Sequence, residues 1–297
     1  MELRQIQYFV AIAELEHFVR ASQRLSIAQP ALSRQMKLLE AELGVELFER
    51  LPRGIRLTDA GRVLLSHLRE VNAQIAAAVT ATKAAAVGRL GVLRLGVIEV
   101  AAWQGIVPES IRRFRAGFPE VELLLSSFDS AAQLTAIRRG GLDAGFLYNA
   151  PADPSLAVRP LRFDPVVLAV PEASPLAGRT DLSIGDLAEE PFIGFRRHLS
   201  PRYFDDTQAA FRKAGIEPRI IAEMGTEADM LALVGSGMGI AFVNASQAWR
   251  PPHSVRFVEV ADFDVGLQLC FVHLKENTSA VVAHMAEIAE GLAKAER

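Results

Sequence analysis

The chain has 297 residues, half of them hydrophobic, and a formal net charge of -3. This length allows two or three domains with a substantial core, and the charge excludes a protein that binds nucleic acid through bulk positive charge. Residues 1–88 hold 11 Lys and Arg against 9 Asp and Glu, and the rest of the chain holds 21 against 26. The net positive charge is therefore confined to the N-terminal part of the chain, and the remainder is acidic.

Cysteine content and the N-terminus indicate the compartment. Cys270 is the one cysteine and lies in the apolar run GLQLCFVHL, so we expect it to be buried and reduced. Without a second cysteine it offers no internal disulfide switch. The chain is charged from Glu2, shows no signal peptide, and has no apolar run as long as a membrane span. These features predict a cytoplasmic protein with no membrane partner.

A first helix is predicted over residues 1–13, followed by two helices between Phe18 and Gly44. Apolar side chains recur at helical spacing, with Phe18, Ala21 and Leu25 on one helix and Leu32, Met36, Leu39 and Leu43 on the next. Pro30 suits the first turn of the second helix and Gly44 its end. The turn is expected near residues 26–29. The opposite face of the second helix presents hydrogen-bonding and cationic groups, namely Gln29, Ser33, Arg34 and Lys37. A helix-turn-helix needs such a face to enter the major groove, although two ordinary core helices fit the apolar pattern equally well.

The next segment, ELFERLPRGIRLT from Glu46 to Thr58, predicts a short strand, a turn that contains the run Pro-Arg-Gly, and a second strand. It carries Arg50, Arg53 and Arg56. A basic hairpin beside a recognition helix is a wing, whose arginines suit the phosphate backbone or a narrow minor groove. The hairpin therefore favours DNA binding over the ordinary core interpretation.

Residues 1–61 resemble the LysR-type transcriptional regulators. The shared patterns are LxQxxYFVxxAExxxF, RLxxAQPALSRQxxxLExELGVxLFER and RLTxAG. The resemblance implies a double-stranded operator as partner, contacted by Arg20, Gln29, Pro30, Ser33, Arg34, Lys37, Arg50, Arg53 and Arg56. Two positions depart from the family. Ala28 replaces a usual Ser, so the recognition helix lacks its hydroxyl cap, and Val19 replaces a usual Ser or Thr.

A long helix is predicted from Asp59 to Val87, with Thr58 as its N-cap. Its apolar seam alternates four- and three-residue steps through Leu64, Leu68, Val71, Ile75, Ala78, Thr82 and Ala85, which is a heptad pattern. Such a seam requires a partner, with packing along the chain's own C-terminal domain as the alternative. The resemblance implies a linker helix that pairs two subunits through Leu64, Leu68, Val71, Ile75 and Ala78, in a homodimer that assembles further into a homotetramer. Gly88 and Gly91 then mark a hinge.

From Val92 onward, strands and helices alternate, which predicts an α/β body with parallel sheets. Strands are expected over residues 93–98, 121–128, 144–148, 165–171, 191–195, 219–224, 240–243 and 266–273. Helices are expected over residues 108–117, 131–139, 203–214, 227–234 and 279–294. Two halves meet near Arg162 and Asp262, so the last strand and helix return to the first half. The layout resembles a periplasmic-binding-protein-like effector domain with two lobes around a cleft.

Ligands in open α/β lobes bind where strands end and helices begin. This rule and the resemblance together name Glu99, Val100, Ala101, Ser130, Phe146, Arg196, Arg197, His198, Tyr203 and Thr226 as effector-binding candidates. Ser130 and Thr226 are expected as N-caps, with ligand contact as an added possibility. Phe146 and Tyr148 fit a cleft wall or a strand core, and residues 196–198 fit an anion site or a solvated loop.

The resemblance favours a small organic or aromatic acid as effector. Glu99 opposes such a ligand, because two carboxylates repel each other. Glu99 is expected to turn onto Arg196 or Arg197 and lock the lobes together, or else to accept a hydrogen bond from an amine or hydroxyl of the ligand.

No catalytic residue, metal site or cofactor is predicted. The glycine-rich run 235–239 follows a helix and precedes a strand, the reverse of a dinucleotide fingerprint. The six histidines lack metal-ligand spacing, and no Ser/His/Asp triad is legible.

We therefore expect an α/β multidomain protein. Its parts are a winged helix-turn-helix over residues 1–58, a linker helix over 59–90 and an effector domain over 91–297. Lobe 1 spans about 91–162 and 264–297, and lobe 2 about 163–263. The expected function is sequence-specific regulation of transcription, with RNA polymerase as a further partner. The alternative is a two-lobed small-molecule-binding protein or enzyme without DNA binding.

Overall fold

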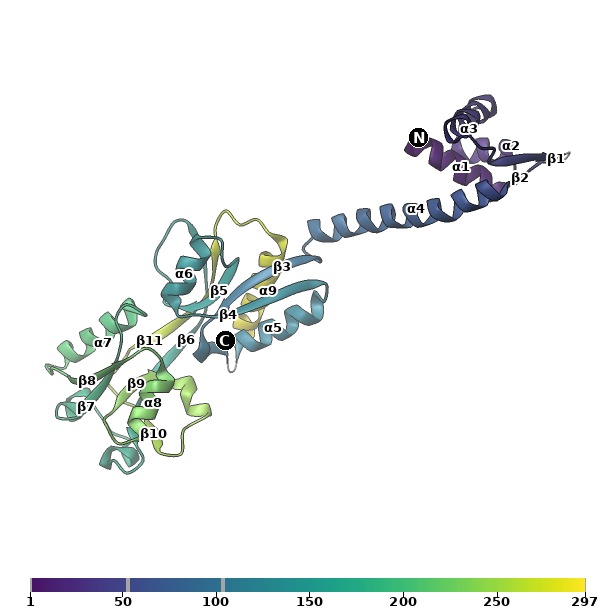
Figure 1. Ribbon diagram of the computed structural model, residues 1–297. Helices are drawn as coiled ribbons and strands as arrows, with labels where there is room; N and C mark the ends of the chain where they lie inside the picture. The colour runs from purple at the N-terminus through teal and green to yellow at the C-terminus, as the bar shows by residue number, and fades with distance from the viewer. Residues whose placement is uncertain (1, 52–53, 103–104, 297) are drawn as a thin grey trace. The chain divides into compact units, whose positions relative to one another are not determined.

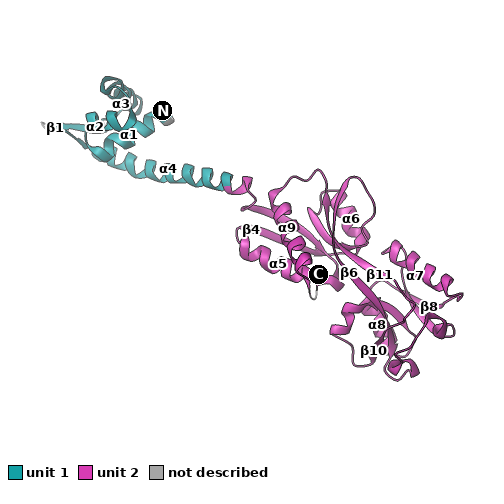
Figure 2. Cartoon of the chain, turned by 180° about the vertical axis from the view of Figure 1, so that it is seen from behind, with its two compact units in different colours: residues 1–83 teal, residues 84–297 magenta. Residues whose placement is uncertain are grey.

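A computed structural model describes residues 2–51, 54–102 and 105–296. The chain divides into two compact units, residues 1–83 and 84–297 (Figure 2). No helix of the described residues is long and apolar enough to cross a membrane.

Unit 1 is a small helical domain with a two-stranded hairpin (Figure 1). Its elements are α1 (Leu3–Leu15), α2 (Phe18–Leu25), α3 (Gln29–Leu43), β1 (Phe48–Leu51), β2 (Gly54–Leu57) and most of α4 (Asp59–Ala86). Phe9, Leu32, Met36 and Leu39 are buried at its centre. The predicted helix-turn-helix and wing are confirmed, and the first helix begins and ends two residues later than expected.

Local backbone chemistry fixes the ends of α2 and α3. Ser26 ends α2 in the left-handed region with a φ of 55°, and Gly44 ends α3 with a φ of 69°. Glycine adopts that conformation without steric cost. Ala28 begins α3 without a side-chain cap, as expected. The prediction that Leu43 belongs to the apolar core face is wrong, because its side chain is 40% exposed at the end of α3.

The hairpin and α4 are joined by a cap and a close backbone approach. Thr58 accepts a hydrogen bond from the backbone N–H of Gly61 at 3.0 Å, which confirms it as an N-cap. A Cβ added to Gly61 would lie 2.2 Å from the carbonyl oxygen of Leu47. Glycine at this position therefore lets α4 pack directly on the segment before the wing.

Unit 2 has a central sheet in the order β10-β6-β11-β5-β3-β4, with β9 also paired to β6, and a separate β7-β8 pair. Its strands are β3 (Gly91–Val97), β4 (Val121–Ser127), β5 (Ala144–Tyr148), β6 (Leu156–Pro171), β7 (Pro191–Phe195), β8 (Arg219–Met224), β9 (Ala241–Asn244), β10 (Val255–Val258) and β11 (Gly266–Leu274). Its α-helices after α4 are α5 (Ile106–Gly117), α6 (Ser130–Arg138), α7 (Pro201–Lys213), α8 (Glu227–Gly235) and α9 (Ala280–Ala295). Short 3-10 helices are η1 (Glu99–Ala102), η2 (Pro175–Gly178), η3 (Ile184–Leu187) and η4 (Ala245–Trp249).

The strand β6 runs through both lobes, which corrects the sequence analysis. Only residues 165–171 were expected to be extended, whereas β6 has 16 residues. Residues 156–165 pair with β11, and residues 166–171 pair with β9 and β10. We define lobe 1 as β3–β5, α5, α6, α9 and β11 with the first part of β6, and lobe 2 as β7–β10, α7 and α8 with the second part. The strand β10 was not predicted.

The expectation of parallel sheets is wrong for much of unit 2. Among the described strands, parallel ladders join β3 with β4 and β5, and β7 with β8. Isolated parallel bridges also join Leu182 to Val260 and Phe192 to Ile240. The strands β5, β6, β9, β10 and β11 pair antiparallel with one another where they meet. The chain returns from lobe 2 into lobe 1 as β11, and that return reverses the strand direction.

Helices cover both faces of the lobe 1 sheet (Figure 1). Side chains alternate along β5, so Phe146 belongs to one buried cluster and Leu147 to another. The same alternation in β11 places Phe271 and Cys270 in these two clusters. Cys270 is 2% exposed, which confirms its predicted burial.

Gly61→Ala tests the packing of α4 on the wing. We expect a loss of about 1–3 kcal/mol in the free energy of unfolding of unit 1, because the new Cβ meets backbone that cannot move freely. Chemical denaturation followed by circular dichroism measures this change. Gly291→Ala in α9 is the matched control, since its Cβ meets nothing within 4 Å, and there the helix should gain about 0.4–1 kcal/mol. Equal stability of the Gly61→Ala variant and the wild type would contradict the proposed close packing.

Candidate functional site

The first candidate site is the exposed face of α3. Leu32, Met36 and Leu39 bury the inner face. The outer face carries five of the predicted DNA-binding residues. Ser33 is half-buried, and four are exposed, namely Gln29, Pro30, Arg34 and Lys37. Since Ala28 supplies no side-chain cap, the first N–H groups of α3 remain available to an anionic group such as a phosphate. The face thus combines an amide and a hydroxyl, groups that can hydrogen-bond to base edges, with two cations.

The wing and α2 carry further arginines, some exposed and one paired with a carboxylate. Arg20 and Arg50 are exposed. Arg56 lies opposite Glu49 in the hairpin, and its guanidinium is 2.7 Å from that carboxylate. Hydrogen bonding to Glu49 raises the pKa of Arg56 and offsets its charge. Arg53, the fourth basic candidate, lies outside the described residues.

The expected seam on α4 divides into two parts. Leu68 is 5% exposed and Leu64 packs against the core of unit 1, so both serve their own domain. This corrects the expectation that the seam needs a partner along its whole length. Val71 and Ile75 are 39% and 44% exposed, and Ala78 is exposed as well. An apolar stripe therefore remains uncovered from Val71 onward.

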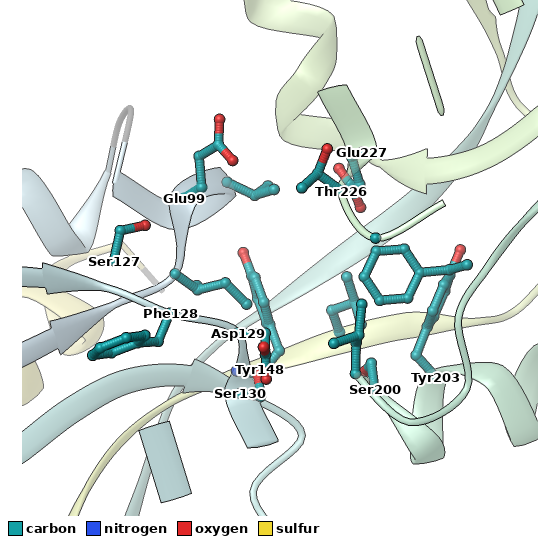
Figure 3. Close-up of a pocket in the computed structure, with 16 residues that line it drawn as sticks. Glu99, Ser127, Phe128, Asp129, Ser130, Tyr148, Ser200, Tyr203, Thr226 and Glu227 are labelled. Atoms are coloured by element: carbon teal, nitrogen blue, oxygen red, sulfur yellow. Dashed lines mark hydrogen bonds between the residues drawn. The ribbon is translucent and has the colours of Figure 1, made fainter. Parts of the chain in front are cut away.

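The second candidate site is a pocket of about 270 Å³ between the lobes of unit 2 (Figure 3). This volume is at the small end of ligand pockets. Its lining residues come from both lobes: Ile98, Glu99, Val100, Ser127, Phe128, Asp129, Ser130, Tyr148 and Leu267 from one, and Phe195, Leu199, Ser200, Tyr203, Gly225, Thr226 and Glu227 from the other.

Three α-helices of the described chain begin at this pocket, and their caps differ. The carboxylate of Asp129 accepts from the N–H of Ala132 at 2.8 Å and caps α6. Thr226 caps α8 by accepting from the N–H of Asp229 at 3.1 Å, as expected. The start of α7 at Ser200 has no side-chain cap.

Ser130 does not cap α6, which corrects its predicted role. It is the first residue of the helix, 7% exposed, and its hydroxyl accepts from the N–H of Tyr148 at 3.1 Å. The preceding Asp129 takes the capping role, because a carboxylate at the N-cap also interacts favourably with the helix dipole.

A buried polar network lies behind the pocket. Tyr148 donates to Asp164 at 2.5 Å and accepts from the side-chain amide of Asn244 at 3.1 Å. Arg162 donates to the other oxygen of Asp164 at 2.5 Å. Burial, followed by the charge of Asp164, raises the pKa of Tyr148 and keeps its hydroxyl protonated. The network joins β5 of lobe 1 to β9 of lobe 2 through β6.

Glu227 is a buried carboxyl group on the lobe 2 side of the pocket. It accepts from the N–H of Asn244 at 3.0 Å and from the side chain of Gln247 at 2.9 Å. Burial raises its pKa to about 7, the two hydrogen bonds lower it, and the charges of Glu99 and Asp164 raise it further. The sequence pattern did not predict Glu227 as a pocket residue, because an acid after an N-cap Thr is common in any first helical turn.

The structure separates the predicted effector residues into three groups. Glu99, Val100, Ser130, Tyr203 and Thr226 line the pocket. Ala101 and Phe146 do not line it, since they are 3% and 0% exposed in the core. Arg196, Arg197 and His198 are exposed residues outside the lining.

The predicted lock between the lobes is not formed by Arg197. Its guanidinium pairs with Asp205 at 2.9 Å within lobe 2. Among the described residues, no ion pair joins Glu99 to Arg196 either. The described lining of the pocket therefore holds carboxyl groups and no Lys, Arg or His. No cluster of three metal-ligating side chains is found among the described residues.

A winged helix-turn-helix and a two-lobed α/β unit with a pocket between its lobes define a DNA-binding regulator with a small-molecule domain. Residues 3–62 match the family of bacterial regulatory helix-turn-helix proteins of the lysR type, and residues 87–293 match the LysR substrate binding domain. The chain belongs to the LysR family of transcriptional regulators.

Relatives match this chain over nearly its whole length. The transcriptional regulator AlsR of Bacillus subtilis is 31% identical over 288 residues, which cover 97% of this chain and 95% of AlsR. TfdS of Cupriavidus pinatubonensis is 32% identical over 289 residues, covering 97% and 98%. The crystal structure of full-length CbnR with its target DNA has a TM-score of 0.81 at 28% identity, covering 99% of this chain and 100% of CbnR. These relatives are named as regulators, so the enzyme alternative is set aside.

Glu227→Gln tests the cost of the buried carboxyl group. Below about pH 4.5 the Glu227 carboxyl is protonated in both the folded and the unfolded chain, so its burial carries no ionisation cost and the folded state has its full stability. As pH rises to about 7, the unfolded chain releases this proton first, so stability falls, and above pH 7 the loss is complete. Since one pKa unit is worth about 1.4 kcal/mol, the substitution should stabilise unit 2 by roughly 2 kcal/mol more at pH 8 than at pH 5.

Urea unfolding of the full chain at the two pH values measures the difference. Glu122→Gln on β4 is the matched control, because Glu122 is exposed. A Glu227→Gln effect that does not change with pH would show that burial does not raise this pKa.

Proposed function

We propose that this regulator binds operator DNA as a dimer paired through α4, with the N-terminal part of α3 in the major groove. A small molecule in the pocket between the lobes changes its affinity for the operator. The observation that carries the proposal is a pocket walled by both lobes in a chain of this family. A ligand bound there alters regulation if it binds two arrangements of the lobes with different affinity.

The exposed groups on α3 support base reading by this helix. Gln29, Ser33 and Arg34 lie on its outer face near the uncapped N-terminus. A bidentate arginine reads guanine edges, and an amide reads adenine edges. Lys37, Arg50 and Arg20 suit phosphates, which fix register without reading sequence. Arg53 is proposed for the wing from the sequence alone.

The exposed stripe on α4 supports pairing of two subunits. Val71, Ile75 and Ala78 continue the heptad spacing beyond the part of the helix that its own domain covers. Assembly of dimers into a tetramer and contact with RNA polymerase stay predictions from the family resemblance.

An organic or aromatic acid, the effector class that the resemblance implies, has one supporting feature in the pocket. The start of α7 at Ser200 has free N–H groups that suit a carboxylate. The cations expected beside it lie outside the described lining.

Binding to the DNA upstream of its own gene tests the proposal. A band shift should show a discrete complex that competitor DNA of random sequence does not displace at equal concentration. Binding of equal strength to both DNAs would contradict operator recognition.

Arg34→Ala tests base reading. We expect a loss of about 1–3 kcal/mol on the operator and a much smaller loss on random DNA, because a base contact confers sequence preference. Arg69→Ala removes the same charge from the exposed surface of α4 and is the control. Equal losses on both DNAs would make Arg34 a phosphate contact.

Ile75→Asp tests pairing through α4. An aspartate in an apolar interface loses its hydration without a partner, so light scattering should show smaller species and operator binding should weaken. Ala73→Asp is the matched control, since Ala73 is exposed on the opposite side of the helix. Leu68 is unsuitable as a probe because it is buried in unit 1. An unchanged mass for Ile75→Asp would exclude this stripe as the interface.

A further inference from the structure

Carboxyl groups from both lobes face the pocket. Glu99 lies on the lobe 1 side in η1, and Glu227 lies on the lobe 2 side in α8 (Figure 3). They are close enough for the charge of Glu99 to raise the pKa of Glu227. Asp129 also lines the pocket on the lobe 1 side, and one of its oxygens caps α6. Each oxygen of Glu227 accepts one hydrogen bond, from Asn244 or from Gln247, and keeps a second lone pair for a ligand. Glu99 and Glu227 therefore offer a ligand one acid from each lobe.

Aromatic side chains line the same space. Tyr148, Phe195 and Tyr203 form walls of the pocket, and the rings of Phe195 and Tyr203 meet edge to face at 6.2 Å. An adjoining recess of about 290 Å³ shares Glu99 and Glu227 with the pocket. Trp249, which is 76% exposed, and Arg250 also line that recess. Aromatic faces combined with carboxylates attract organic cations through cation–π and charge contacts.

Among the described residues that line the pocket there is no Lys, Arg or His, and Arg250 lines only the adjoining recess. Arg162 lies behind the lining and is bonded to Asp164. Arg197 is bonded to Asp205 on the outer surface of lobe 2. Two of the three helix starts that would attract an anion are occupied by their own caps, Asp129 and Thr226.

We propose that the pocket takes a small organic ammonium ion with an apolar body, its charged nitrogen between Glu99 and Glu227 and its body against the aromatic walls. This inference rests on the proposed function, because it names the ligand class of the same pocket. An ammonium group bonded to both acids joins lobe 1 to lobe 2, which is the differential contact that a ligand needs to favour one arrangement of the lobes.

Proton linkage gives the binding a pH dependence. Glu227 must be ionised to pair with the ammonium, and its pKa in the empty pocket is about 7. Affinity should therefore rise several-fold from pH 6 to pH 8, where a primary amine stays charged. The charges of Glu99 in η1 and Asp164 in β6 act on Glu227, and Asp229 lies in the same first turn of α8. Arg250 after η4 lines the adjoining recess with Glu227. The other titratable groups that interact with Glu227 are the hydroxyls of Tyr148 and Tyr203.

Matched amines and acids test the proposal on the full-length protein. The probes are butylamine, phenethylamine and tryptamine, each paired with butanoate, 3-phenylpropanoate or 3-indolepropanoate. At pH 8, at least one amine should raise Tm in a concentration-dependent way, and its paired acid should not. Calorimetry should then give the Kd of that amine at pH 6 and pH 8.

Variants identify the pocket as the binding site. Glu99→Gln should weaken binding of the amine by tenfold or more, because it keeps the shape and removes the charge. Glu99 is exposed, so this variant keeps the folded core. Glu122→Gln on β4 removes an equal charge far from the lining residues and should leave the Kd unchanged. Glu227→Gln should weaken binding and also abolish its rise between pH 6 and pH 8.

The proposal is overturned if no amine raises Tm more than its paired acid, or if Glu99→Gln binds the amine as tightly as wild type does. The band shift with the upstream DNA separates this result from the proposed function. A specific DNA complex without amine binding rejects only the ligand class. Amine binding without any specific DNA complex rejects the proposed regulation and leaves the ligand class standing.

Discussion

The continuity of β6 is the constraint on which unit 2 depends. One strand pairs with β11 in lobe 1 and then with β9 and β10 in lobe 2. The lobes therefore share one continuous strand at their junction, and the pocket forms where their loops and helix starts face each other. The network of Tyr148, Asp164 and Asn244 lies at this junction. Because these polar groups are buried, losing one of them would leave a donor or acceptor of its neighbour unsatisfied.

The same junction explains the charge of the pocket. Glu227 begins α8 and is held by the backbone of Asn244 and by Gln247. These bonds come from β9 and η4, so folding of lobe 2 places a carboxyl group in a poorly hydrated position whether or not a ligand is present. Burial is costly for the ionised form. A cation that enters the pocket offsets this cost, and so does a proton. Ligand binding and protonation are therefore alternatives at one group.

In unit 1, α4 serves two purposes along its length. Its first turns pack on the helix-turn-helix through Leu65 and Leu68 and approach Leu47 at Gly61. Its later turns expose Val71, Ile75 and Val79. A heptad pattern shows that a face is apolar, but it does not distinguish contacts within the domain from contacts with a partner. The tertiary contacts of Leu68 make that distinction.

The sequence by itself determined the winged helix-turn-helix, the helix that follows it, and most elements of the α/β body. These features depend on local chemistry, such as apolar spacing on α3, the cap at Thr58 and the left-handed glycine at Gly44. The sequence also predicted that Thr226 caps α8 and that Glu99 lies at the pocket. Only the tertiary structure decided that β6 crosses both lobes, that Phe146 and Ala101 are core, and that Glu227 is a buried acid facing the pocket. It also showed that the three predicted cations lie outside the lining. Burial and ion pairing depend on segments far apart in the chain, and the periodicity of one segment carries no information about them.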